Sequence, residues 1–132
     1  MNLLKVLPIL SVILVSACTQ QPSGEGDGLI SSSIAISSPA GGQTFNSGDV
    51  MKIQYDSVNV DHYQIWFTTN PDFACDSAGW VLVKNHPYYP KSFDYTVPPR
   101  DTTTARIRVE GHSSAHATLT FTCSNLFTIS SQ

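Results

Sequence analysis

Charged residues are scarce in this chain of 132 residues. They make up 13% of it, with 7 Lys and Arg against 10 Asp and Glu, and the formal net charge at pH 7 is -3. So few basic residues provide no electrostatic footprint for a phosphate backbone, which argues against nucleic acid as a partner. The apolar fraction of 41% and the small net charge also exclude a wholly disordered chain.

The chain also lacks the motifs of catalysis. No G-x-S-x-G nucleophile elbow occurs, no Cys/His pattern indicates an activated thiol, and the Asp residues stand singly beside turns instead of in pairs. We therefore expect no catalytic residues, no enzyme activity and no cofactor.

The histidines provide no complete metal site. His112 and His116 would lie about 13 Å apart on a strand, so only a loop could bring them together. His62 and His86 are the further candidates, but no Cys or acidic residue stands at a short fixed offset from either member of the pair. We expect no metal, and we interpret these side chains as solvated loop histidines.

What is present begins with an apolar leader. Lys5 gives a positive start, and a run from Val6 to Ala17 follows that is too short to span a membrane as a helix. The run ends in Val15-Ser16-Ala17-Cys18, which resembles the bacterial lipobox, in which the Cys becomes the lipidated first residue of the mature chain. The resemblance implies a signal peptide over 1–17 and a lipid anchor on Cys18. The alternative is an ordinary cleaved signal with an accidental Cys.

Residues 18–33 then form the lipidated Cys and a flexible linker. Gly, Ser and Gln dominate this segment, and it has almost no apolar period. In lipoproteins of this type an Asp after the Cys retains the product at the inner membrane, and here that position is Thr19. By this resemblance, in a Gram-negative host, we expect a protein of the cell envelope anchored to the outer membrane.

Residues 34–132 have the pattern of an all-β domain. Short runs of Val, Ile, Thr, Tyr and Phe alternate with Gly, Pro, Asn and Asp, and no window sustains a helical period. About seven strands, which indicate a β-sandwich, are predicted at Ile34–Ser37, Val50–Asp56, His62–Thr68, Trp80–Lys84, Ser92–Val97, Ala105–Glu110 and within Thr118–Ile129. The predicted core stripes are Met51/Ile53/Tyr55, Tyr63/Ile65/Phe67, Phe93/Tyr95/Val97, Ala105/Ile107/Val109 and Phe127/Ile129.

Several segments carry a family resemblance. Ile36-Ser37-Ser38-Pro39-Ala40-Gly41-Gly42, Lys52-Ile53-Gln54-Tyr55, Tyr95-Thr96-Val97-Pro98 and Leu126-Phe127-Thr128-Ile129 are similar to the Ser-Thr-rich, GPI-anchored membrane domain of fungal cell-wall assembly proteins and bacterial surface proteins. The resemblance spans 36–129 and implies an immunoglobulin-like, fibronectin III-like sandwich without a catalytic motif. The chain departs from the family where Tyr55 takes the place of a frequent Trp and where Cys75 and Cys123 lie in inserted segments.

Cys75 and Cys123 remain once Cys18 is set aside. Export to an oxidising compartment permits a disulfide between them, which would tie the Asn70–Gly79 loop to the segment before the last strand. Two free thiols are the alternative, because a sequence does not show whether the two Cα atoms approach within bonding range.

Two candidate binding patches emerge from the strand pattern. Because Tyr63, Ile65 and Phe67 point inward, Trp66 points outward. Pairing of the third and sixth strands of an immunoglobulin-like sandwich would set it near Arg106 and Arg108. Either this face is open for binding, or the Asn70–Gly79 loop folds over it.

The second patch is His86-Pro87-Tyr88-Tyr89-Pro90, whose prolines would present Tyr88 and Tyr89 on a stiff loop. The alternative is that the two tyrosines plug the end of the sandwich.

These features favour a lipid-anchored, non-catalytic binding module. Its partners would be the membrane, through Cys18, and an unknown surface protein or glycan. Protein interaction or adhesion is the first hypothesis, recognition of cell-wall or extracellular polysaccharide is the alternative, and a small hydrolase inhibitor is the third.

Overall fold

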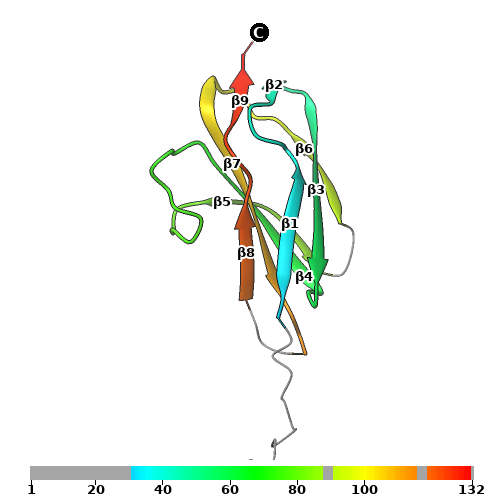
Figure 1. Ribbon diagram of the computed structural model, residues 1–132. Helices are drawn as coiled ribbons and strands as arrows, with labels where there is room; N and C mark the ends of the chain where they lie inside the picture. Colours follow the sequence, from blue (N-terminus) through cyan, green and yellow to red (C-terminus); the bar gives the residue numbers. More distant parts are fainter. Residues whose placement is uncertain (1–30, 88–90, 116–118, 132) are drawn as a thin grey trace, which may run out of the picture.

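Two β-sheets pack face to face in this protein (Figure 1). The structure is a computed structural model that describes residues 31–87, 91–115 and 119–131. These residues include no helix that is long and apolar enough to cross a membrane. Their strands are β1 (Ser33–Ser38), β2 (Thr44–Asn46), β3 (Val50–Val58), β4 (His62–Thr68), β5 (Val81–Pro87), β6 (Ser92–Thr96), β7 (Thr102–His112), β8 (Leu119–Cys123) and β9 (Phe127–Ser130).

The smaller sheet has the strand order β1-β3-β6, and the larger has the order β2-β9-β7-β4-β5 with β8 paired to β7. All pairs are antiparallel except β2 with β9. The chain therefore crosses from one sheet to the other between β1 and β2. The predicted all-β sandwich is confirmed.

The core lies between the sheets and consists of the side chains that alternate inward. All members of the predicted stripes are buried except Phe93 and Tyr95, which are partly buried and pack against the core. Val60, just before β4, is a further core residue that the strand pattern did not indicate. The period of two along β3, β4 and β7 explains this agreement, because each inward residue meets the inner face of the opposite sheet.

The described residues form nine strands where about seven are predicted, and the two additional strands have local causes. β2 has only three residues, too few for a visible alternation. The predicted final strand is divided into β8 and β9 because Ser124 interrupts the ladder: its Oγ accepts a hydrogen bond from the Ile107 backbone N–H at 3.0 Å. A serine hydroxyl competes readily for backbone groups in this way.

The two ends of the sandwich are distinguished by the strands that begin and end there. We call one of them the proximal end. It is the end where β1 begins at Ser33, where β3 ends at Val58 opposite Ser33, and where β4 begins at His62. The distal end holds Thr68 at the end of β4 and Val81 at the start of β5. In Figure 1 the proximal end is at the bottom.

Gly111 on β7 is predicted to tolerate no side chain. A Cβ at this position would lie 2.6 Å from Val60 Cγ1 and 2.7 Å from Ile34 Cδ1, inside the packed core. We expect Gly111→Ala to lower the free energy of unfolding by about 1–3 kcal/mol, measured by urea denaturation, because overpacking forces the neighbours to move. Val58→Ala, at a side chain that is 56% exposed, should change it by less than about 0.5 kcal/mol. Equal effects of the two variants would contradict this packing.

Candidate functional site

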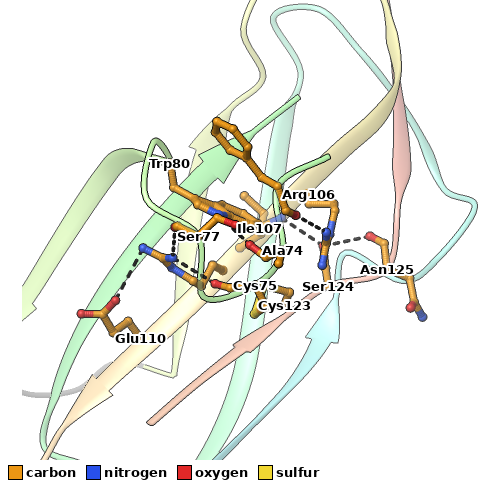
Figure 2. The surroundings of a disulfide bond; sticks show 12 residues. Ala74, Cys75, Ser77, Trp80, Arg106, Ile107, Glu110, Cys123, Ser124 and Asn125 are labelled. Atoms are coloured by element: carbon orange, nitrogen blue, oxygen red, sulfur yellow. Dashed lines mark hydrogen bonds and ion pairs between the residues drawn. A yellow bond between two sulfur atoms is a disulfide. The ribbon is translucent and has the colours of Figure 1, made fainter. Parts of the chain in front are cut away.

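The segment between β4 and β5, residues 69–80, forms a loop over the outer face of the larger sheet, and we call it the stapled loop. Its Cys75 is bonded to Cys123 at the end of β8, with an S–S distance of 2.04 Å and a Cα–Cα distance of 5.8 Å. The predicted disulfide is confirmed. Figure 2 shows Ala74, Cys75, Ser77 and Trp80 of the loop close to this bond.

Arg108 on β7 connects the outer face of the larger sheet to the stapled loop. Its Nη1 donates hydrogen bonds to the backbone oxygens of Cys75 at 3.0 Å and Ser77 at 3.1 Å. Its guanidinium carbon lies 5.0 Å from the ring centroid of Trp66 and 5.1 Å from that of Trp80. Arg108 is only 7% exposed, and Nη2 lies 3.6 Å from a carboxylate oxygen of Glu110. This arginine therefore joins the sheet to the loop through its charge, its donors and two indole rings.

Arg106 repeats the arrangement two residues earlier on β7. Its Nη1 donates to the backbone oxygen of Phe73 at 2.9 Å, and its guanidinium carbon lies 5.6 Å from the Trp80 ring centroid. Trp80 is 6% exposed, and its Nε1 donates to the Ala74 oxygen at 3.2 Å. The two arginines and Trp80 thus donate hydrogen bonds to four backbone oxygens of the loop, those of Phe73, Ala74, Cys75 and Ser77. These hydrogen bonds leave the loop little freedom to move.

The structure brings the first predicted patch together. Trp66 on β4 lies opposite Arg108 on β7 in the register, as the expected strand pairing requires. Of the two alternatives for this face, the geometry matches the covering loop: Trp66 is partly buried, and its Nε1 is buried without a hydrogen-bond partner among the described residues. Trp66, Arg106 and Arg108 therefore shape the surface mainly through the loop that they hold.

The outer side of the stapled loop is what faces solvent here. Pro71, Asp72, Ala74, Asp76 and Ala78 are exposed on it. On β5, which follows the loop, Leu82 is 44% exposed and lies opposite outward-facing Trp66, whereas Val81 is 61% exposed and lies opposite inward-facing Phe67. The outer side of the stapled loop therefore exposes both acidic and small apolar side chains.

Other predicted positions lie outside the described residues. These are Cys18 with the leader 1–17, the linker up to residue 30, Tyr88 and Tyr89, and His116. The lipid anchor, the domain boundaries and the tyrosine patch stay predictions. Of the strands on either side of the tyrosine patch, β5 ends opposite His62 at the proximal end of the sandwich, whereas β6 begins opposite Gln54 in the middle of β3.

A polar cluster occupies the proximal end. Asp61 accepts hydrogen bonds from the backbone N–H of Ser114, at 3.0 Å, and from its hydroxyl, and it also contacts Nδ1 of His62. The carboxylate stands between the hydroxyl and the imidazole, whereas a catalytic triad places the imidazole in the middle. The hydrogen bonds from Ser114, followed by that from His62, lower the pKa of Asp61 to about 2.

The histidines of β4 and β7 also meet at this end. His62 lies opposite His112 in the register, and His112 Nε2 lies 3.1 Å from Glu110 Oε1. Within residues 31–87, 91–115 and 119–131, no group of three His, Cys, Asp or Glu side chains is arranged to hold a metal ion.

Sequence reasoning missed the roles of Trp80 and Phe73. Trp80 was predicted to start a strand, but β5 begins one residue later at Val81, and the indole packs on Arg106 and Arg108 instead. The available signal was an aromatic residue on each side of Cys75 in one loop, which indicates a segment with its own small core.

Comparison with known proteins supports the fold. No known protein family and no curated protein matches the sequence. Among solved structures, the chain is similar to the fibronectin(III)-like modules of CbhA from Clostridium thermocellum, with a TM-score of 0.55 and 7% sequence identity over 75% of this chain and 98% of that chain. The protein thus contains a fibronectin III-like β-sandwich, and at this identity the match shows the fold alone.

Removal of the disulfide is predicted to weaken the domain strongly. The bond joins residues 48 apart, and the loop-entropy model then gives about 4 kcal/mol. We expect the double variant Cys75→Ser/Cys123→Ser to lose about that much free energy of unfolding in urea. Reduced wild-type protein should show the same loss. A loss below about 1 kcal/mol in both would contradict the loop-entropy account.

The Asp61 cluster predicts a pH-dependent stability. Because its pKa falls from the ordinary value of 3.8 to about 2 on folding, the ionised carboxylate stabilises the native state above pH 4, and this contribution disappears as the pH falls towards 2. We expect the urea midpoint of Asp61→Asn to lie below that of the wild type at pH 7, with the gap closing between pH 4 and pH 2. Asp72→Asn, in the stapled loop, provides the background variant. A gap that stays constant over this range would refute the prediction.

Proposed function

We propose that the protein is a lipid-anchored component of the cell envelope whose fibronectin III-like domain is a non-catalytic module that binds a protein partner at the surface. The observation that carries this proposal is the stapled loop. A disulfide, four hydrogen bonds to its backbone oxygens and the two arginines over its indole fix its shape. A surface that is already ordered loses little conformational entropy on binding.

The position of the loop suits an anchor at Cys18. The chain that precedes Ser33 joins the domain at its proximal end, whereas the stapled loop leaves β4 and rejoins β5 at the distal end. A flexible spacer of the length of residues 19–33 spans about 20 Å on average. With the lipid in the membrane, this arrangement would present the stapled loop away from the bilayer.

The chemistry of the surface favours a protein over a sugar. The stapled loop exposes the acids Asp72 and Asp76, and the edge strand β5 that follows it exposes Val81 and Leu82. An edge strand with free backbone groups and a mixed apolar and acidic border suits a polypeptide partner. The polysaccharide hypothesis relied on Trp66, Tyr88 and Tyr89, and the Trp66 ring is occupied by Arg108. A small hydrolase inhibitor would use the same stapled loop, and the partner recovered below distinguishes it.

Site-specific crosslinking in intact cells tests this proposal. A photo-crosslinking residue is placed at exposed Ala78 of the stapled loop and, as a control site, at exposed Lys52 on β3 in the other sheet. We expect one discrete protein adduct from position 78 and none from position 52. Leu82→Asp should weaken the adduct about tenfold, because it puts a charge into an apolar contact. Val58→Asp, at a similarly exposed apolar residue of β3, should leave it unchanged.

The anchor is tested in the same cells. Cys18→Ala should release the protein from the membrane fraction and reduce the adduct at position 78. Membrane association that survives this substitution would contradict lipidation, and adducts of equal strength from positions 78 and 52 would contradict a specific partner. An adduct with a hydrolase would support the inhibitor hypothesis, and one with a polysaccharide would support glycan recognition.

A further inference from the structure

A concave pocket of about 330 Å³ opens at the distal end of the sandwich, between the stapled loop and the segment that joins β6 to β7. We call it the distal pocket. Its lining combines apolar and polar groups: Phe67, Thr68, Thr69, Asn70, Phe73, Gly79, Val81, Tyr95, Pro98 and Arg100. The volume lies at the lower end of the range of ligand pockets and accommodates one side chain of a partner.

The apolar walls of the distal pocket have a fixed position. Phe67 and Tyr95 pack against each other with ring centroids 5.7 Å apart. Gly79 lets the Phe73 ring lie directly on the backbone, because a Cβ at Gly79 would stand 2.7 Å from Phe73 Cζ. The φ of Gly79 is +97°, which a residue with a side chain rarely adopts. The disulfide at Cys75 and the hydrogen bond from Arg106 to the backbone oxygen of Phe73 keep this wall in place.

The polar side of the pocket offers donors and one positive charge. Arg100 is exposed, and no carboxylate of the described residues lies within ion-pair distance of its guanidinium. The neighbouring Asp101 is engaged elsewhere, since its oxygens accept hydrogen bonds from the backbone N–H and the hydroxyl of Ser131. Asn70 uses Oδ1 to accept from the Asp72 N–H at 3.0 Å, which leaves its Nδ2 as a donor.

Tyr95 adds a neutral phenol to this wall. Burial raises the pKa of Tyr95, and the nearby positive charge of Arg100 opposes this rise only in part. At neutral pH its hydroxyl therefore keeps its proton. The distal pocket thus combines aromatic walls, neutral donors and an arginine at its edge that has no partner carboxylate.

We propose that the distal pocket binds an apolar side chain of a polypeptide partner, preferably an aromatic one, whose adjacent carboxylate pairs with Arg100. This inference rests on the proposed function, because it gives the chemistry that the partner must present. The aromatic walls match the side chain, and the unpaired guanidinium matches the carboxylate, which an arginine can take in a bidentate way. A uronic acid offers the same carboxylate but exposes hydroxyl groups where the walls are apolar.

Titration with small probes, followed in ¹H–¹⁵N NMR spectra of the full chain in detergent, tests the pocket without the partner. We expect N-acetyl-phenylalanine to shift the amide signals of Thr69, Asn70, Gly79 and Arg100 in a saturable way. N-acetyl-phenylalaninamide, which lacks the carboxylate, should bind about tenfold more weakly. Glucuronic acid should bind more weakly than N-acetyl-phenylalanine at the same residues.

Two matched variants assign the charge. Arg100→Gln should reduce the affinity for N-acetyl-phenylalanine about tenfold and remove the difference between acid and amide. Lys52→Gln, which deletes the same charge on the outer face of the smaller sheet, should leave both affinities unchanged. Absent saturation, equal binding of acid and amide to the wild type, or tighter binding of glucuronic acid would each overturn the proposal. These results are independent of the crosslink at position 78, so a failure of the pocket and a failure of the partner proposal are told apart.

Discussion

The contact between Arg108 and the two tryptophans is the interaction on which the surface of this domain depends. Without it the outer face of the larger sheet would consist of an indole, two cations and a loop with unpaired backbone oxygens. A desolvated cation over an indole contributes about 2 kcal/mol, and here one guanidinium serves two rings and two carbonyl groups. Its Nε and the Trp66 Nε1 are buried without partners in the described part of the chain, so part of this gain is offset.

The same contact defines what the sandwich can offer a partner. Arg106 and Arg108 donate hydrogen bonds to backbone oxygens of the stapled loop, which lies over them. They therefore do not form a basic patch on the surface. What reaches the surface is the outer side of the stapled loop, with its acids and the apolar start of β5. Arg100, whose side chain makes no such hydrogen bond to the described residues, lies at the distal end. Arg106 and Arg108, of which Arg108 is buried and Arg106 partly buried, thus support the loop from beneath, whereas Arg100 is exposed.

Much of the sandwich could be predicted from periodicity, and little of the loop could. The stripes on β3, β4 and β7 follow from a period of two, and the pairing of Trp66 with Arg108 follows from the strand order. The disulfide could be predicted because Cys75 and Cys123 are the two cysteines that remain once Cys18 is set aside. The wall formed by Phe73 on Gly79 depends on the irregular course of one loop, and the break at Ser124 depends on a single hydroxyl that bonds to a residue 17 positions away; no periodic pattern encodes either.

The edge of the larger sheet carries a safeguard against uncontrolled association. Opposite Ile65 and Trp66 the ladder of β5 shifts register, which leaves Val83 as an extra residue, and exposed Lys84 and Asn85 follow. A bulge and a lysine on an edge strand interrupt the regular backbone pattern that a second copy would need for continuous pairing. Only the short apolar stretch at Val81 and Leu82 precedes this irregularity. Neighbouring copies crowded together would therefore resist zipping into extended aggregates along β5.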